Sequence, residues 1–408
     1  MKKLLALLAL FPLTLTADWT QFRGPTGQGH STSAKLPVRW SKNMNVAWRQ
    51  AIPGSGWSSP IIHSGKIYIT TAVELKGGAL SLEVYCLDVA RGKGVWKQKL
   101  FHVSKENVVS INKKNSHATP TPVIDAGKLY VHFGHLGTAC LDLQGNVIWK
   151  NDTIKYPPVH GGACSPVIAG DKLFFSCDGA RNAFVIALNR GTGKVAWRKL
   201  RNMNGKRQFS FCTPLVIELD GKQQIVSPGS DAVIAYEPAS GREIWKVRYP
   251  DGYSVVPRPV YGHGLVYVCT GFGQASLFAI KPDGSGDVTD SHVVWKTNRS
   301  VPHTPSLLLV DEEIYMVSDN GIATCRNAKT GEEIWKERLG GKYSSSPIFA
   351  AGRAYFLSED GKTVVMQLGK SHKIIATNEL KERSLASFAV DGNSLFIRTE
   401  KNLYKIGR

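Results

Sequence analysis

The sequence is poor in acidic residues and in the short motifs that mark most catalytic sites. Its 32 Asp and Glu residues are dispersed, so no pair of carboxylates suited to acid–base chemistry stands out. No CxxC pair, no G-x-S-x-G nucleophile elbow and no phosphate-binding glycine loop occurs. These absences disfavour zinc and redox centres, serine hydrolases and nucleotide-binding enzymes.

Long hydrophobic runs and blocks of charge are also lacking. After the first 17 residues, no apolar stretch reaches the ~20 residues of a membrane-spanning helix. The 51 Lys and Arg residues give a formal net charge of +19, but they are scattered along the chain. A solvated basic surface is the simplest interpretation, and an acidic partner such as an anionic polysaccharide is the alternative. No nucleic-acid partner is expected.

The N-terminus has the pattern of a secretory signal peptide. Two lysines precede a short apolar segment, and Ala17 is a small residue at a plausible cleavage point before Asp18. We expect residues 1–17 to be a signal peptide and the mature chain to be exported, soluble, and periplasmic or extracellular. No cysteine follows the cleavage point, so a lipid anchor is not indicated. Residues 18–45 are predicted to form an N-terminal extension on the rim of the domain that follows.

The cysteine pattern favours buried thiols. The odd count leaves at least one thiol unpaired in an exported chain. Most of the cysteines lie within apolar strand patterns, which predicts free buried thiols, although the sequence leaves their pairing open. The seven are Cys86, Cys140, Cys164, Cys177, Cys212, Cys269 and Cys325.

What the sequence does contain is a repeat marked by tryptophan. A short apolar run, a Trp and usually a basic residue recur at Trp48, Trp96, Trp149, Trp197, Trp245, Trp295 and Trp335. The steps between them are 48, 53, 48, 48, 50 and 40 residues. A period of this size indicates a repeat architecture that shares one continuous core.

Each repeat has the composition of four short β-strands separated by Gly, Asp and Asn turns. The first strand carries a Ser/Thr-Pro or similar step: Ser59-Pro60, Thr119-Pro120, Ser165-Pro166, Thr213-Pro214, Arg258-Pro259, Thr304-Pro305 and Ser346-Pro347. The fourth strand holds the Trp. Four antiparallel strands in about 40–50 residues describe one propeller blade.

The two ends of the repeat region are predicted to complete one blade. Residues 385–406 supply three strands without a fourth, and Val46-Ala47-Trp48 is a fourth strand without the preceding three. Pairing them would leave no free sheet edge at the closure. The sequence therefore predicts an all-β, eight-bladed propeller over residues 46–408, expected to be monomeric. The tryptophans are interpreted as large side chains that fill the outer part of each blade, not as a ligand cage.

The order Ser-Pro, G-K-x-Y, A-L-D and T-G-K-x-x-W resembles the pyrroloquinoline-quinone (PQQ)-like propeller repeat over about residues 46–407. The opening DWTQFRGPTGQG, followed by LPVRW, resembles exported PQQ-like proteins of planctomycetes and verrucomicrobia, which are often described as similar to the scaffold BamB. This resemblance implies a binding or interaction scaffold with a protein partner at one propeller face. Its alternative implication is a PQQ-dependent or degenerate quinoprotein oxidoreductase with calcium. The sequence lacks the vicinal cysteine pair of many such enzymes and shows no clear calcium-binding constellation.

In a propeller, the connections from an outer strand to the next inner strand and from a second to a third strand emerge on one face, around the axis. Two of these loops are long, over Thr71–Glu83 and Phe101–Ser116. The candidate ligand-binding residues on this face are His117, His160, Asp178, Arg181, Arg258 and His303. A ring of such side chains could bind an anionic ligand. The simpler alternative is that each His bonds to backbone or faces water. No metal site is predicted, because no HxH or HxxxH spacing occurs, and no catalytic residue is assigned.

Overall fold

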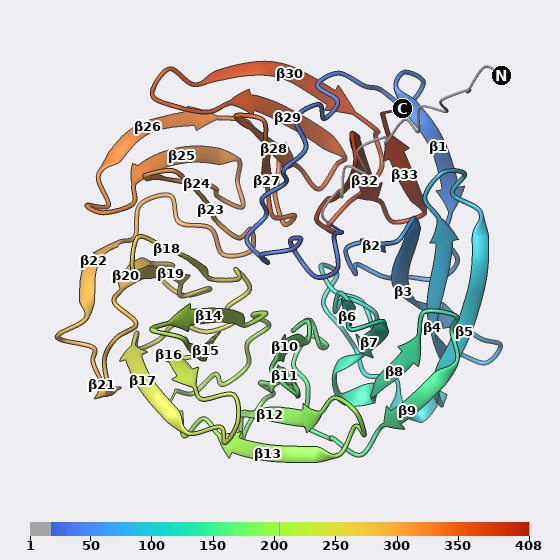
Figure 1. Cartoon of the computed structure of the whole chain (residues 1–408), viewed down its shortest axis with the longest axis horizontal. Helices are drawn as coiled ribbons and strands as arrows, with labels where there is room; N and C mark the ends of the chain where they lie inside the picture. The colour runs from blue at the N-terminus through green and yellow to red at the C-terminus, as the bar shows by residue number, and fades with distance from the viewer. Residues whose placement is uncertain (1–17, 204, 408) are drawn as a thin grey trace, which may run out of the picture.

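The computed structural model describes residues 18–203 and 205–407, and the predicted signal peptide lies outside them. Eight sheets surround a central axis (Figure 1). Each sheet has four antiparallel strands, in chain order in seven of the eight sheets, and one sheet carries a fifth, parallel strand at its outer edge. The predicted all-β, eight-bladed propeller is confirmed.

The strands of each blade run from the axis to the rim. The inner strands are β2 (Ile61–His63), β6 (Val123–Asp125), β10 (Val167–Ala169), β14 (Leu215–Leu219), β18 (Val260–Gly262), β23 (Leu308–Val310), β27 (Ile348–Ala350) and β31 (Ala389–Asp391). The second strands are β3 (Lys66–Glu74), β7 (Lys128–His132), β11 (Lys172–Cys177), β15 (Lys222–Pro228), β19 (Leu265–Cys269), β24 (Glu313–Val317), β28 (Arg353–Leu357) and β32 (Ser394–Arg398).

The third strands are β4 (Leu80–Asp88), β8 (Thr138–Asp142), β12 (Phe184–Asn189), β16 (Ala232–Tyr236), β20 (Leu277–Ile280), β25 (Ile322–Asn327), β29 (Lys362–Gln367) and β33 (Asn402–Ile406). The outer strands are β5 (Gly94–Val103), β9 (Val147–Asn151), β13 (Val195–Leu200), β17 (Glu243–Arg248), β22 (Val293–Thr297), β26 (Glu333–Arg338), β30 (Lys373–Glu379) and β1 (Val46–Ala51). The fifth strand β21 (Gly286–Asp287) and two single 3-10 turns, Lys105–Asn107 and Gly134–Leu136, complete the elements.

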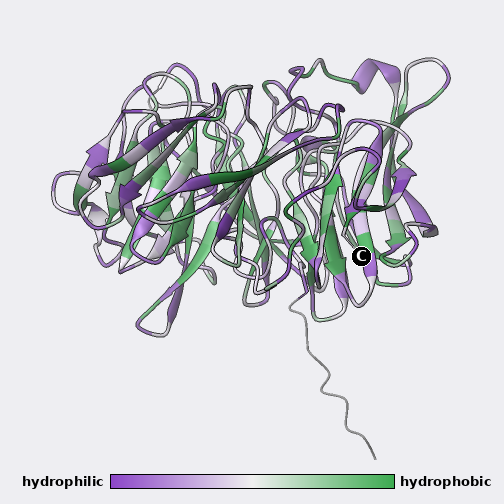
Figure 2. Ribbon diagram, turned by 90° about the horizontal axis from the view of Figure 1, so that it is seen from above, coloured by the Kyte–Doolittle hydropathy of each residue, from purple (hydrophilic) through white to green (hydrophobic). Residues whose placement is uncertain are grey.

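Burial explains why the strands differ in composition. The second and third strands pack against neighbouring blades on both faces, so β19 and β20 are buried at every position and read as continuous apolar runs. The outer strand β22 has one face in solvent, and its burial alternates with period two. Hydrophobic segments accordingly fill the interior of the blades, while the loops are polar (Figure 2).

The ring closes as the sequence predicts. Strand β1, from the N-terminal side, pairs antiparallel with β33, the last strand of the chain. Val46 lies opposite Ile406 and Ala51 lies opposite Asn402. The eighth blade is therefore assembled from both ends of the repeat region, which joins them without a free edge.

Tryptophans join six of the eight blades to the blade that follows. Six of the seven indole N–H groups donate to a carbonyl in the turn before the outer strand of the following blade: Trp48 to Val89, Trp96 to Leu143, Trp149 to Arg190, Trp197 to Pro238, Trp295 to Ala328 and Trp335 to Gly369. Trp245 instead bonds Gln224 of its own blade, because the turn in the next blade is expanded over residues 281–292 and contains β21. The structural interpretation of the tryptophans is confirmed.

Blade seven has no such tryptophan, and the topology explains why. Ala376 of β30 stands opposite Val365, as Trp335 stands opposite Cys325 in the preceding blade. The turn on which a Trp would dock lies between the third and fourth strands of the next blade. In the eighth blade those strands are β33 and β1, which no turn connects. The N-terminal extension covers this place with Trp40, whose backbone N–H donates to Asn378 at 2.8 Å.

The extension follows the rim only in part, which corrects the sequence prediction. Ser41 does pair beside Glu379 on the edge of blade seven. The earlier residues instead cross the inner strands near the axis (Figure 1). Trp19 pairs with Ile62 of blade one, and His30 pairs with Phe349 of blade seven. Burial of Trp19, whose side chain is 1% exposed, favours this path, because the rim does not provide an interior for so large an apolar side chain.

Replacement of Gly193 by Ala tests the contact between blades. Gly193 has a φ of +71°, and a Cβ there would lie 2.4 Å from the ring of Trp149. Gly65 has the same φ with nothing within 4 Å, so Gly65→Ala is the matched control for backbone strain. We expect Gly65→Ala to destabilise the protein by about 1 kcal/mol, and Gly193→Ala by about 1–3 kcal/mol more through overpacking. Chemical denaturation measures both, and equal losses would contradict this role of the glycine.

All seven cysteines are free and buried, as predicted. Cys86, Cys140 and Cys325 occupy equivalent positions opposite the tryptophan of their blades. Burial raises the pKa of the Cys86 thiol to about 12, so it stays protonated and unreactive at neutral pH. Within the described part of the chain, no helix is long and apolar enough to cross a membrane.

Candidate functional site

A ring of hydroxyl groups closes around the propeller axis. At the start of seven of the eight inner strands, a backbone N–H donates to the Ser or Thr hydroxyl of the neighbouring blade. The bonds run from Ser59 to Thr121, Thr121 to Ser165, Ser165 to Thr213, Arg258 to Ser306, Ser306 to Ser346, Ser346 to Ser387 and Ser387 to Ser59, at 2.9–3.1 Å. The only position of the ring without a hydroxyl is Arg258.

In two repeats, the residue that occupies the ring lies two positions after the one that the sequence pattern indicates. The sequence assigns Thr119-Pro120 and Thr304-Pro305 to the inner-strand step, but Thr121 and Ser306 occupy the ring. A shift of two residues keeps the side chain on the same face of a strand, so the pattern alone does not distinguish the two choices. Thr119 and Thr304 lie one level higher, on the wall of the cavity above the ring.

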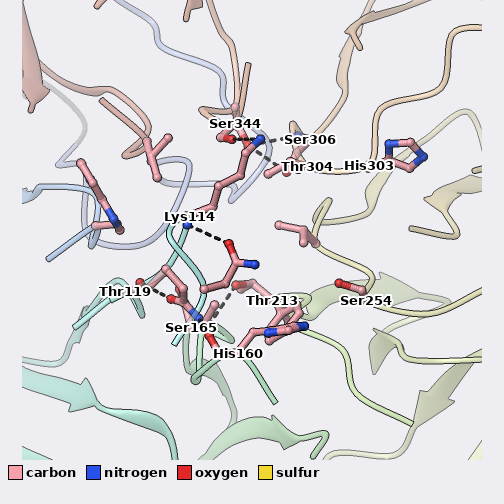
Figure 3. A pocket seen from close by; sticks show the side chains of 18 of the residues that line it. Lys114, Thr119, His160, Ser165, Thr213, Ser254, His303, Thr304, Ser306 and Ser344 are labelled. Carbon is pink, nitrogen blue, oxygen red and sulfur yellow. Dashed lines mark hydrogen bonds between the residues drawn. The ribbon is translucent and has the colours of Figure 1, made fainter. Parts of the chain in front are cut away.

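That cavity is an axial funnel of about 730 Å³. Its lower lining is the hydroxyl ring, and its wall is formed by the residues two positions earlier in each blade: Trp57, Thr119, Ala163, Phe211, Val256, Thr304, Ser344 and Leu385. Figure 3 shows Thr119, Ser165, Thr213, Ser306 and Ser344 around this space. Phe22 of the N-terminal extension also lines it. The extension therefore contributes to the floor of the funnel.

One side of the funnel is aromatic. Phe209, Phe211, Tyr253 and Phe272 line it. Tyr253 packs edge-on against Phe209 with ring centroids 5.6 Å apart. Phe272 is 41% exposed and stacks on the imidazole of His303 at 4.6 Å. Exposed aromatic faces of this kind are the surfaces on which apolar or planar groups bind.

The opposite side is polar and is supplied by the loop after β5. Lys114 pairs with Glu359 at 2.7 Å across the mouth, and the carbonyl of Lys113 accepts a bond from Arg383 at 2.6 Å. Asn115 donates to the carbonyl of His160 at 2.7 Å. The predicted long loop thus reaches blades three and seven. The other predicted long loop, Thr71–Glu83, is instead an extension of the β3–β4 hairpin, with its turn at residues 75–79.

Of the six candidate residues, His160 and His303 line the funnel (Figure 3). His160 packs edge-on against Phe209 at 5.5 Å. The backbone N–H of His303 donates to Asp319 at 2.7 Å, and its imidazole lies 3.8 Å from the same carboxylate. These two histidines belong to the aromatic side of the site.

The other four candidates do not line the funnel. His117 bonds the carbonyl of Val109 at 3.2 Å, and burial lowers its pKa. Arg181 is exposed. Arg258 is buried and directs its guanidinium to the N-terminal extension, where it bonds the carbonyl of Phe22 at 2.7 Å. The expected convergence of these side chains on one pocket therefore does not occur.

Asp178 forms a buried ion pair with Arg201. The carboxylate accepts from Nε at 2.7 Å, and both side chains are almost fully buried. Arg201 also donates to the carbonyl of Ser227 at 3.0 Å. Burial raises the pKa of Asp178 to about 6, and the charge of Arg201 opposes this rise. The carboxylate is thus ionised at neutral pH and inaccessible to a ligand.

None of the four Phe and Tyr residues on the aromatic side of the funnel was among the candidates taken from the sequence. Phe209, Phe211, Tyr253 and Phe272 lie in loops without a repeated motif. The available signal is their position: aromatic residues in the loops of the axial face have no strand core to fill. Loop aromatics on the axial face are therefore the pattern that could have indicated this surface.

Comparison with known proteins places the chain in a family. The family model described as outer membrane protein assembly factor BamB (PQQ_2) matches residues 38–208, 81–336 and 285–372, which together cover most of the chain. The crystal structure of BamB from Moraxella catarrhalis superposes with a TM-score of 0.62 and 14% identity, covering 89% of this chain and 97% of that one.

Quinoprotein dehydrogenases are similar as well. A europium-containing methanol dehydrogenase superposes with a TM-score of 0.69 and 11% identity over 95% of this chain and 90% of that one. The quinoprotein ethanol dehydrogenase of Pseudomonas aeruginosa is 25% identical over 238 residues, which are 49% of this chain and only 37% of the dehydrogenase. At these identities the solved structures establish the fold alone. With its family match and its eight closed blades, the chain belongs to the PQQ-repeat propeller family described as outer membrane protein assembly factor BamB.

Proposed function

We propose that the protein is an exported interaction scaffold that binds a protein partner at the funnel mouth without covalent chemistry. The observation that carries this proposal is the lining of the funnel. Its aromatic side, with Phe272 41% exposed, offers an apolar surface for a partner. Its ring hydroxyl groups, in contrast, already serve as acceptors for backbone N–H groups of the propeller.

The family supports a protein as the partner. The matching model is described as an outer membrane protein assembly factor. We therefore take an unfolded outer-membrane protein as the partner class. An aromatic surface bordered by Lys and Asn suits an extended chain, because apolar side chains supply affinity while polar groups bond its backbone. The signal-peptide pattern of residues 1–17 supports export to the compartment in which such a chain is met.

Quinoprotein chemistry is the second candidate, favoured by the similarity to the ethanol dehydrogenase. The residues of the funnel do not fit a calcium ion that would accompany the quinone. Calcium takes six to eight oxygen ligands, usually with several carboxylates. Asp319 is the only carboxylate among the lining residues, and it already accepts bonds from His303 and Thr304. Within residues 18–203 and 205–407, no group of three His, Cys, Asp or Glu residues could hold a metal.

Binding of an unfolded outer-membrane β-barrel protein tests the scaffold function. Phe272→Ala removes an exposed ring from the aromatic side, and we expect the dissociation constant to rise about tenfold, as for a moderate interface hot spot. Ile148→Ala is the matched control, because Ile148 is 45% exposed but lies on outer strand β9. Fluorescence anisotropy with a labelled partner measures both. Equal affinities for the two variants would place binding away from the funnel.

Reconstitution with PQQ and calcium tests the second candidate. We expect no turnover in a dye-reduction assay with primary alcohols, since the funnel lacks the calcium donors described above. Intact folding is verified in the same sample by circular dichroism. Sustained, PQQ-dependent dye reduction would overturn the scaffold proposal.

A further inference from the structure

Two buried arginines lie next to each other beneath the floor of the funnel, and neither has a carboxylate partner among residues 18–203 and 205–407. Arg23 of the N-terminal extension is 1% exposed, and Arg258 of the ring is 2% exposed. Burial and, to a smaller extent, the charge of Arg258 lower the pKa of Arg23 to about 9. Both groups remain charged at neutral pH.

Arg258 contacts only neutral acceptors. Its Nε donates to the carbonyl of Pro214 at 3.0 Å, its Nη1 to the carbonyl of Phe22 at 2.7 Å and its Nη2 to Oε1 of Gln21 at 3.2 Å. These bonds connect the ring to the extension but do not balance the charge. Burial lowers the pKa of Arg258 to about 10.

Arg23 has spare donors. Its Nη2 donates to the carbonyls of Gln28 and Leu307. Its Nε and Nη1 are buried and have no hydrogen-bond partner among the described residues. His30, on whose pKa the charge of Arg23 acts, also has a buried Nε2 without a partner. Asp311 is the one carboxylate that raises the pKa of His30, and it has no such influence on the pKa of Arg23 or Arg258.

Buried charges in proteins are normally paired, because their desolvation is otherwise severely unfavourable. Water could satisfy the free N–H groups but could not neutralise two guanidinium ions. We propose that a small monovalent anion of the halide class binds between Arg23 and Arg258 and joins the N-terminal extension to the propeller. The site lies below the funnel and is separate from the proposed protein-binding surface.

Close packing favours a small anion over phosphate or a carboxylate. The backbone of the extension lies directly on both guanidinium groups: a Cβ on Gly27 would be 2.3 Å from Arg258, and one on Gly29 would be 2.7 Å from Arg23. Phe22 lies between this region and the funnel. A polyatomic anion would therefore have to displace more of this chain than a single spherical ion would.

The Ser and Thr residues at the other ring positions suggest a conservative substitution for Arg258. Arg258 stands where the other seven blades have Ser or Thr, and its side chain offers no acceptor to Thr213 of the preceding blade. Arg258→Thr therefore removes one charge and can supply the missing hydroxyl of the ring. Arg23→Gln is the second variant, and it removes the donors that have no partner.

Thermal unfolding of the full mature protein in sodium chloride and in sodium gluconate at equal ionic strength tests the proposal. We expect the unfolding temperature of the wild type to rise with chloride concentration, since an ion that binds only the folded state stabilises it. Both variants should lose most of this dependence. A wild type that responds equally to chloride and gluconate would overturn the proposal.

Bromide locates the site directly, and this readout does not depend on the folding of any variant. Crystals of the wild type grown in sodium bromide should show an anomalous peak between the guanidinium groups of Arg23 and Arg258. A map with no peak there, at a resolution that shows both side chains, would refute the site even if chloride stabilised the protein through its surface.

Discussion

Replacement of Asp178 by Asn should destabilise the protein by about 3–5 kcal/mol, because it leaves the buried charge of Arg201 without its counter-ion. Both side chains are almost completely shielded from water, and Nε of Arg201 lies 2.7 Å from the carboxylate. Asparagine has nearly the same volume as aspartate, so the loss reports the charge and not a cavity. The free energy of unfolding from chemical denaturation measures this effect.

An exposed ion pair provides the control. Lys172 and Asp171 are 2.6 Å apart, but the aspartate side chain is 67% exposed. Asp171→Asn should therefore change the free energy of unfolding by less than about 1 kcal/mol. The pair of variants also tests the sequence hypothesis that Asp178 binds ligand. Weaker partner binding by Asp178→Asn with unchanged stability would support a ligand role and contradict the structural one.

Replacement of Trp197 by Ala should cost about 3–5 kcal/mol, the usual range for loss of a buried Trp. The indole packs on Phe174 of its own blade and on Tyr236 of the next, with ring centroids 5.5 and 6.5 Å apart. Its N–H donates to the carbonyl of Pro238 at 2.9 Å. The substitution thus removes contacts between blades three and four together with those within blade three.

Two further variants separate packing from hydrogen bonding. Trp197→Phe keeps most of the ring but loses the N–H, so we expect a loss of about 1 kcal/mol from the bond plus a smaller packing loss. Leu200→Ala changes an apolar residue of the same strand that is 51% exposed, and its effect should stay within about 0.5 kcal/mol. If Leu200→Ala were as damaging as Trp197→Ala, the strand edge and not the indole would be what joins the blades.

Neighbouring blades are joined in different ways at the rim and at the axis. The outer contacts are tryptophans on turns, while the inner contacts are N–H groups on hydroxyls in a ring. The proposed partner-binding surface is the loop layer above the ring, where Phe272 and Lys114 lie.

The sequence by itself determined the eight blades, their closure and the burial of the cysteines. These properties depend on local information: period-two burial within a strand, turn residues between strands and a repeated Trp. The closure between Val46 and Ile406 followed from counting strands at the two ends, because an incomplete blade leaves unpaired backbone groups.

Only the tertiary structure decided which side chains meet at the axis. Thr119 and Thr121 each precede a proline and lie on the same face of the strand, so the sequence does not show which of them belongs to the ring. The bonds of Thr121 with Ser59 and Ser165 in adjacent blades decide this. Arg258 turned toward the extension and not toward the funnel because Phe22 offers it a buried carbonyl. Contacts of this kind join residues far apart in sequence, and they exist only once the eight blades have closed into a ring.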